Sequence, residues 1–391
     1  MATFTETEIG DLVDRVRSWS PATDSNDAEF TYIDLSSVDK DSKSIVNPVR
    51  TPCADAPSRA RQLVAYGDVL VSTVRPNLNG VAAVPAELDG ATASTGFCVL
   101  RPRPEKVCWR YLYHWVRSPA FIRDMTRKAT GASYPAVSDR IIHDSKIPLP
   151  KLEEQKRIAA ILDKADAIRR KRQEACMIAR DAVRHVFLHE FGDPISNPNA
   201  FDQRPISEVA KIVTGNTPSR KEPDNYGDEI EWIKSDNINT PSHYLTEATE
   251  RLSKIGEKKS RTVPAGATLI TCIAGSPDCI GNAALTDRRV AFNQQINAAI
   301  PGDQLVDRFL YAMILVLKPA IQQLSSKSMK GLVSKGRFET LQVIVPPKPQ
   351  QERFATLFDL IVGVAKKMDT AAEDSDRLFN SLVQRAFKGE L

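Results

Sequence analysis

The chain has 391 residues, 42% of them hydrophobic and 26% charged, so it is long for one domain and we expect two or three packed domains. A formal net charge of only +4 excludes a tail that holds polyanions through bulk charge, so any nucleic-acid site must be local. The N-terminal sequence lacks a signal-peptide pattern, and no apolar run approaches the ~20 residues of a membrane span, so we expect a cytoplasmic protein without membrane contact. Six scattered cysteines form no C-x-x-C, so we expect neither a disulfide framework nor a zinc knuckle.

The first half begins with short β-like runs separated by Pro, Gly and Asn, and a helical pattern follows at residues 109–117. The clearest strand predictions are residues 69–74 and 97–100. A proline hinge at Pro148 and Pro150 then ends the globular part. A long helix is predicted from about Glu153 to Phe191, roughly 55 Å at 1.5 Å per residue.

The second half has the same internal order. Strands are predicted at residues 268–273 and 296–300, and a helix at residues 305–317. A second proline hinge at residues 346–349 precedes a second long helix.

An internal repeat explains this order. Residues 150–159 (PKLEEQKRIA) recur as residues 346–355 (PPKPQQERFA), with Gln155 matching Gln351. Further matches are Tyr32-Ile33 with Trp232-Ile233, YGDVLVST from Tyr66 with AGATLITC from Ala265, and Tyr111-Leu112-Tyr113 with Phe309-Leu310-Tyr311. One half-molecule is therefore written twice.

Both long helices carry apolar residues at alternating three- and four-residue steps, which over about four heptads predicts a coiled coil. The predicted seam of the first helix is Ile158, Ile161, Ala165, Ile168, Ala175, Ala179, Ala182 and Val186, interrupted by Arg172. That of the second is Phe354, Leu357, Ile361, Val364, Met368, Ala371, Leu378 and Leu382, interrupted by Ser375. The charges between, such as Arg169 and Arg170, are interpreted as a solvated face. We expect the helices to pair antiparallel, each domain lying beside the far end of the other half's helix.

The layout resembles the specificity subunit of type I restriction-modification enzymes. The residues that carry the resemblance are Pro148-Leu149-Pro150-Lys151-Leu152-Glu153-Glu154-Gln155, then Gly215-Asn216-Thr217-Pro218-Ser219, and Asn293-Gln294. The second hinge departs from the pattern with QQER in place of EQKR, and Trp19-Ser20-Pro21 stands where the first half would need G-x-T-P-S.

The resemblance implies an α+β fold of two tandem target-recognition domains, each followed by a long helix, with the two helices forming an antiparallel coiled coil. The expected bounds are residues 1–147 and 193–344 for the two domains, and residues 148–192 and 345–391 for the hinges and helices. Each domain would read one half of a bipartite site in double-stranded DNA, and the helices would set the spacer between the halves. Two modification (methyltransferase) subunits would bring S-adenosylmethionine, and restriction/translocase subunits would bring ATP and Mg, so this chain itself would need no cofactor.

Reading base edges requires Arg, Lys, Asn and Gln, whereas phosphates are also bound by Ser, Thr and backbone N–H groups. For the first domain we predict two DNA-binding clusters, the first being Arg75, Asn77 and Asn79, and the second Arg127, Lys128, Thr130, Ser133 and Tyr134. For the second they are Asn216, Thr217, Ser219, Arg220, Lys221, Lys234, Asn293 and Gln294, with Lys327, Lys330 and Lys335 as phosphate clamps. The alternative interpretation of each is an ordinary solvated loop or turn residue.

Motifs for catalysis are missing, and we expect no catalytic or metal site. Asn197-Pro198-Asn199 is the nearest approach to the N-P-P-Y of an adenine methyltransferase, and no G-x-x-x-x-G-K is present. His185 and His189 share a helix face without a third ligand nearby. A coiled-coil adaptor that binds protein remains the main alternative function, and a self-contained nucleic-acid enzyme is a third hypothesis.

Overall fold

The computed structural model describes residues 4–24, 28–326 and 331–391. The chain divides into two compact units, unit 1 with residues 1–172 and 371–391, and unit 2 with residues 173–370. The two long helices, α5 (Leu152–Phe191) and α11 (Lys348–Lys388), are each continuous and contribute one part to each unit. Among the described residues, no helix is long and apolar enough to cross a membrane.

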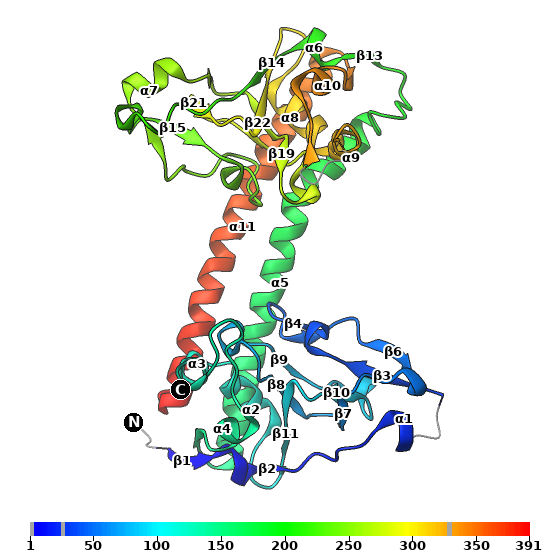
Figure 1. The fold of residues 1–391 in the computed structure, drawn as a ribbon, viewed down its shortest axis with the longest axis vertical. Coiled ribbons are helices and arrows are strands. Elements are labelled where there is room, and N and C mark those ends of the chain that lie inside the picture. The colour runs from blue at the N-terminus through cyan, green and yellow to red at the C-terminus, as the bar shows by residue number, and fades with distance from the viewer. Residues whose placement is uncertain (1–3, 25–27, 327–330) are drawn as a thin grey trace. The chain divides into compact units, whose positions relative to one another are not determined.

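Unit 1 contains two four-stranded sheets (Figure 1). The first has the order β6 (Val49–Pro52), β3 (Glu29–Ile33), β10 (Thr92–Ser94), β7 (Ala60–Leu63). The second has the order β2 (Val13–Asp14), β11 (Phe97–Pro102), β8 (Val69–Ser72), β9 (Val81–Ala83). The remaining elements are β1 (Thr5–Glu8) paired with β12 (Lys146–Leu149), β4 (Val38–Asp39) paired with β5 (Ser44–Ile45), and helices α1 (Pro21–Asp24), α2 (Trp109–Val116), α3 (Pro119–Lys128) and α4 (Asp139–His143).

Unit 2 repeats the topology of both four-stranded sheets and of the β1–β12 pair. Its first sheet has the order β16 (Arg251–Leu252), β15 (Tyr226–Ile233), β21 (Val290–Phe292), β17 (Thr262–Val263). Its second has the order β14 (Ala210–Thr214), β22 (Ile296–Pro301), β18 (Thr268–Thr271), β20 (Ala283–Leu285). The remaining elements are β13 (Asp202–Pro205) paired with β24 (Gln342–Val345), β19 (Ile273–Ala274) paired with β23 (Gly331–Leu332), and helices α6 (Ile206–Val209), α7 (Lys254–Lys259), α8 (Asp307–Val316), α9 (Lys318–Gln323) and α10 (Lys335–Glu339).

The predicted duplication is therefore confirmed. In both units a central pair of strands is parallel, β3 with β10 and β15 with β21, and their outer neighbours are antiparallel. The predicted strands coincide with β8, β11, β18 and β22, and the predicted shorter helices with α2 and α8. The long-helix prediction from about Glu153 to Phe191 matches α5 within one residue.

The glutamine repeated at both hinges is buried for a structural reason. The Gln155 amide accepts a hydrogen bond from the Cys108 N–H (2.9 Å) and donates to the Pro150 carbonyl (2.9 Å). The Gln351 amide accepts from the Val306 N–H (2.9 Å) and donates to the Pro346 carbonyl (2.8 Å). Because buried backbone groups need partners, each glutamine locks the start of a long helix to the unit in which that helix begins.

In each unit the two long helices run antiparallel, as expected. In unit 1, Arg157 lies by Leu391, while Arg172 further along α5 reaches Ala371 and Ser375 earlier in α11. In unit 2, Arg180 pairs with Asp369 at 2.7 Å, and Phe187 further along α5 packs on Phe354 earlier in α11.

The distant helix completes the core of each unit. Val383 and Ala386 of α11 are buried in the core of unit 1, where the Phe387 ring lies 5.2 Å from Tyr111. Val183 and Phe187 of α5 are buried in the core of unit 2. Each globular fold is therefore finished by residues from the other half of the sequence.

The predicted register of the seam is wrong by one residue over most of its length. Ile168, Val364 and Leu378 are 45%, 41% and 60% exposed. The buried positions in unit 1 are instead Leu162 and Asp166 on α5, and Ala372, Ser375, Val383 and Ala386 on α11. Those in unit 2 are Cys176, Val183 and Phe187 on α5, and Phe358 and Ala365 on α11. A search for apolar spacing alone misses this line because Asp166 belongs to it.

The interpretation of the α5 charges as a solvated face also needs correction. Arg169 and Arg170 both bind the buried carboxylate of Asp166 at 2.7 Å, and Arg117 at the end of α2 adds a third contact at 3.2 Å. Burial raises the pKa of the Asp166 carboxyl, but these three guanidinium groups outweigh burial and hold it well below its ordinary value. This ionic cluster ties α5 to the globular part of unit 1.

Candidate nucleic-acid interface

In unit 1 the first predicted cluster lies on the loop that follows β8. Pro76–Leu78 forms a single 3-10 turn, with Arg75 before it and Asn79 after it, both in the left-handed region at φ 51° and 48°. Asn77 is exposed on this turn. The backbone carbonyl of Asn79 already accepts a hydrogen bond from the Lys43 ammonium at 2.7 Å.

The second predicted cluster lies beside the first. Thr130 pairs with Ala136, which also bridges to Val74, so the loop that follows α3 lies against the loop that follows β8. The Arg75 guanidinium lies over the Tyr134 ring at 4.7 Å, and Tyr134 is 69% exposed. An exposed cation stacked on an exposed aromatic ring offers both a forked donor and a stacking face, so these two residues form the centre of the candidate interface in unit 1.

The other members of that cluster are less directly placed. Arg127 and Lys128, at the end of α3, both pair with Asp124 at 2.7 Å. Ser133 is exposed on the loop next to Tyr134. The two cations therefore have a partner on their own helix, which a phosphate would have to displace.

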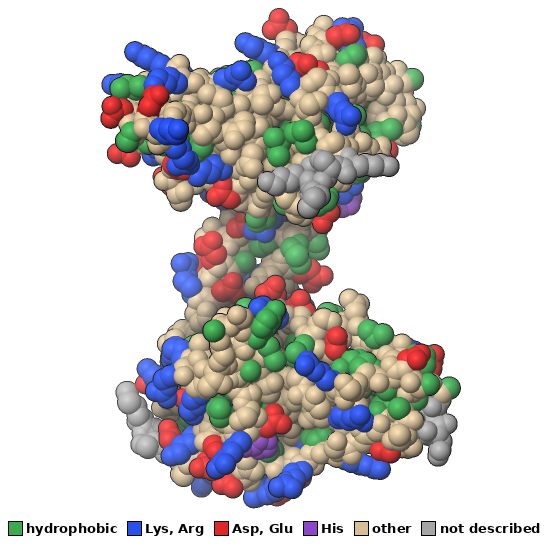
Figure 2. Space-filling view, viewed as in Figure 1, with side chains coloured by type: hydrophobic (Ala, Val, Ile, Leu, Met, Phe, Trp, Pro, Cys, Tyr) green, Lys and Arg blue, Asp and Glu red, His purple; other side chains and the backbone are tan. Residues whose placement is uncertain are grey.

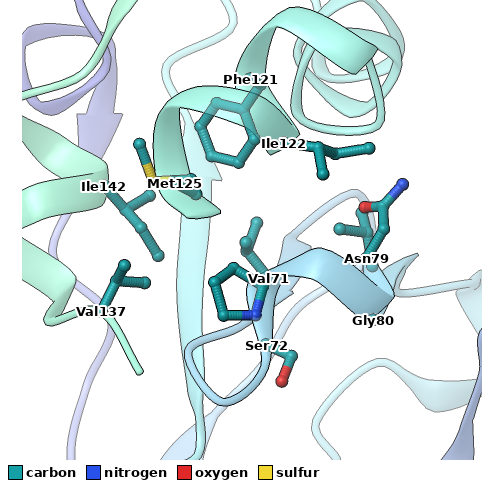
Figure 3. Close-up of a pocket in the computed structure, with 11 residues that line it drawn as sticks. Val71, Ser72, Asn79, Gly80, Phe121, Ile122, Met125, Val137 and Ile142 are labelled. Carbon is teal, nitrogen blue, oxygen red and sulfur yellow. The ribbon is translucent and has the colours of Figure 1, made fainter. Parts of the chain in front are cut away.

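A small apolar cavity of about 10 Å³, space for one water, shows what supports these loops. Figure 3 shows residues of α3 and α4 facing the end of β8 and the turn after it, the labelled ones being Phe121, Ile122, Met125, Val137, Ile142, Val71, Ser72, Asn79 and Gly80. Pro76 also lines the cavity and is buried. The turn is thus anchored by its proline while Asn77 projects to solvent.

In unit 2 the G-N-T-P-S segment is held against β21 and β17. A Cβ at Gly215 would lie 2.2 Å from the Asn293 carbonyl oxygen, so only glycine fits there. The Asn216 side chain donates to the Lys259 carbonyl (2.9 Å) and accepts from the Arg261 N–H (2.8 Å). Asn216 therefore positions the loop, whereas exposed Thr217 contacts exposed Gln294.

Arg220 and Lys234 share one carboxylate beside two aromatic rings. Arg220 pairs with Glu250 at 2.9 Å, and Lys234 pairs with the same carboxylate. The Arg220 guanidinium lies 5.1 Å from the Tyr226 ring and 5.5 Å from the Trp232 ring, and the Lys234 ammonium lies 5.2 Å from the latter. This cation and aromatic group is the centre of the candidate interface in unit 2.

The remaining predicted residues of unit 2 have different positions. Ser219 and Lys221 are exposed beside Arg220. Asn293 is 6% exposed and its side chain accepts the Gln295 N–H at 3.0 Å, so it shapes a turn. Lys335 begins α10 and pairs with Glu339 at 3.5 Å. Lys327 and Lys330 lie outside the described residues.

Sequence reasoning missed the unit 2 counterpart of the Arg75 loop. Pro277–Cys279 forms a 3-10 turn between β19 and β20, as Pro76–Leu78 does between β8 and β9. Asp278 thus occupies the place of Asn77. The internal repeat could have found this loop, had it been extended past the strand match.

The face drawn in Figure 2 has Lys and Arg interspersed with Asp and Glu over each unit. This agrees with the low net charge and with local contacts rather than a broad cationic surface. Within the described parts of the chain, no group of three or more His, Cys, Asp or Glu could hold a metal ion.

Glu250 restrains the charge of the unit 2 interface. Burial raises the pKa of its carboxyl, but hydrogen bonds from Arg220 and Lys234 outweigh burial and lower the pKa below its ordinary value. The carboxylate is therefore ionised at neutral pH, and the stabilisation from these pairs is present above the ordinary pKa and lost as the pH falls through the lowered one.

We expect Glu250→Gln to tighten binding to duplex DNA and to steepen its dependence on salt by about one unit of log–log slope, because two cations lose their internal counter-charge. Fluorescence anisotropy at several salt concentrations measures this. Glu229→Gln is the control, since it removes the same charge from the neighbouring strand β15 but only a 4.0 Å contact with Lys254. Equal slopes for the two variants would contradict the prediction.

Comparison with known proteins agrees with the duplicated architecture. Residues 66–175 and 198–366 match the family model of the type I restriction modification DNA specificity domain. The type I restriction enzyme HindI specificity subunit of Haemophilus influenzae is 23% identical over 423 residues, covering 86% of this chain and 89% of that relative. The putative type I restriction enzyme MjaX specificity subunit of Methanocaldococcus jannaschii is 19% identical over 350 residues, covering 83% and 79%.

Two solved structures share the fold. One, from work on complex assembly and conformational transition of the type I R-M system, gives a TM-score of 0.63 at 24% identity and covers 100% of this chain and 99% of its own. The S subunit of a type I restriction-modification system from M. genitalium gives 0.57 at 12% identity, with 98% and 96% covered. Because the family model matches more than half of the chain, once in each half, this protein belongs to the family of type I restriction-modification specificity subunits, with two DNA specificity domains.

Proposed function

We propose that this chain provides the DNA sequence specificity of a type I complex and catalyses no reaction itself. Unit 1 and unit 2 each recognise one half of a bipartite duplex target. Two modification subunits, which bind S-adenosylmethionine, methylate the target, and restriction/translocase subunits that use ATP and Mg act on DNA lacking that methylation. A cytoplasmic location is part of this proposal, and the six unpaired cysteines support it.

The observation that carries the proposal is a repeated scaffold with different exposed loops. The two units share strand order and the buried hinge glutamines Gln155 and Gln351. The exposed residues at the candidate interfaces differ, with Arg75 over Tyr134 in unit 1 and Arg220 beside Trp232 in unit 2. A shared scaffold with different reading residues is what two unlike half-sites require.

Docking of modification subunits on the long helices is supported by exposed apolar side chains. The large exposed ones on the helices are Ile168, Met177, Ile178, Leu357, Leu360, Val364 and Leu378. Contiguous exposed apolar surface marks protein interaction sites, and Leu357, Leu360 and Val364 share one face of α11 at three- and four-residue steps.

Binding of the assembled methylating complex to target duplex DNA tests the proposal. We expect specific binding whose logarithm falls linearly with the logarithm of salt concentration, because phosphate contacts release counterions. A duplex with both half-sites scrambled is the control and should bind more weakly. A complex that assembles but shows no preference between the two duplexes would refute the proposed role.

A further inference from the structure

A groove of about 550 Å³, lined by several polar and charged side chains, lies wholly within unit 2 beside α5. Arg180 and Arg184 form its helical wall. Residues 238–243 also line it, as do Asn282 and Lys318. We call this cavity the α5 groove.

The groove has more hydrogen-bond donors than acceptors. The Lys318 ammonium donates a hydrogen bond to the Asn282 side chain at 2.6 Å, and the Asn282 amide donates one to the Asn239 side chain at 2.9 Å. These two hydrogen bonds leave two ammonium hydrogens of Lys318 and the amide hydrogens of Asn239 unused. Arg184 makes no ion pair with any residue that the structure describes, although its guanidinium carries five donors. An acceptor-rich ligand would satisfy these groups.

The charge of the groove also favours an anion. Three cations, Arg180, Arg184 and Lys318, line it against one carboxylate, Asp181. Arg180 is paired with Asp369 at 2.7 Å, whereas Asp181 lies 3.3 Å from His185. In addition, Thr240 lines the groove with a buried Oγ1 atom that has no hydrogen-bond partner among the described residues.

The place of the groove indicates which anion it takes. Its Gly281 to Ala283 edge directly follows the Pro277–Cys279 turn, the counterpart of the turn that carries Asn77 in unit 1. A DNA strand that meets this turn would carry its phosphates past the groove. Arg, Lys, Asn, Ser and Thr are also the side chains that bind DNA phosphates.

We propose that the α5 groove is a binding site for a phosphate of the DNA backbone, with Arg184 and Lys318 as its main charged contacts. The inference rests on the proposed function, since it concerns how the same DNA is held. It assigns to α5, the helix from the first half of the sequence, a direct contact with the DNA at unit 2.

The corresponding groove of unit 1, about 380 Å³, differs in charge. Its helical wall carries Asp376 and Asn380 where the repeat places Arg180 and Arg184 in unit 2. Its cations Lys43, Arg117 and Arg169 are therefore opposed by more carboxylates. Burial and the nearby Arg117 lower the pKa of Lys43 to about 8, which weakens it further as an anion contact above that pH. The phosphate site is thus specific to unit 2.

Arg184→Gln in the assembled methylating complex tests the site. Arg184 is exposed and contributes no described ion pair, so the variant should fold normally. We expect weaker binding by the same factor for target and scrambled duplexes, with the salt slope reduced by about one. Arg184→Lys should retain most of the slope because it keeps the charge. Lys366→Gln, at an exposed position of α11 outside the groove, is the matched control and should leave the slope unchanged.

Three results would overturn the inference. An unchanged slope for Arg184→Gln, with wild-type complex binding DNA normally, would exclude the phosphate contact and leave the proposed function intact. Normal DNA binding with weakened assembly would assign the groove to an acidic segment of the modification subunit instead. Wild-type complex that shows no preference for target DNA would refute the proposed function, and the inference with it.

Discussion

Replacing Phe187 by alanine is expected to destabilise unit 2 by about 3 to 5 kcal/mol, although Phe187 belongs to the helix of the first half. The side chain is 0% exposed. Its ring lies 5.1 Å from Phe191, 5.3 Å from Phe309 and 5.6 Å from Phe354. Removing it opens a cavity at the point where α5, α8 and α11 meet, and rigid neighbours cannot close such a cavity fully.

Hydrogen exchange read by mass spectrometry resolves which unit is affected. We expect faster exchange in β18 and β22 of unit 2 and unchanged protection in β8 and β11 of unit 1. Ile178→Ala is the matched control on the same helix, because Ile178 is 65% exposed and its loss leaves no cavity. Loss of protection in unit 1 but not unit 2 would contradict the exchange of helices between the halves.

The sequence predicted the fold well because the repeat and the helical spacing are local signals. Gln155 and Gln351 could be matched without knowing that each binds the hinge backbone. The predicted seam register is wrong because the buried positions of α5 include Asp166. The Asp166 carboxylate is buried only because Arg117, Arg169 and Arg170 surround it. That compensation depends on tertiary contacts and has no signature in apolar spacing.

The sequence predicts which residues belong to the candidate interface better than it predicts how their side chains contact one another. The sequence assigns Arg75 and Tyr134 to two separate clusters, because their stacking depends on how the loop after α3 folds back. Asn216 and Asn293 were selected as contact residues, yet their side chains bind neighbouring backbone, a use that residue type alone cannot distinguish.

Substitutions in the loop that follows β8 are expected to change the DNA sequence that is recognised. We expect the double variant Arg75→Gly, Asn77→Ala to relax or change one half of the target only, because a lost base contact costs about 1 to 3 kcal/mol at its own position. Glycine is chosen at position 75 because its backbone is left-handed there, at φ 51°. The matching variant of unit 2 is Thr217→Ala, Gln294→Ala, which removes two exposed side chains and keeps Asn216, the residue that holds the loop.

Sequencing of methylated adenines in cells that carry the complete system, with the wild-type chain or with either double variant, tests the central claim most directly. We predict a bipartite target in which the unit 1 variant alters one half and the unit 2 variant alters only the other. A variant that rewrites both halves, or two variants that alter the same half, would contradict the assignment of one recognition domain to each half-site.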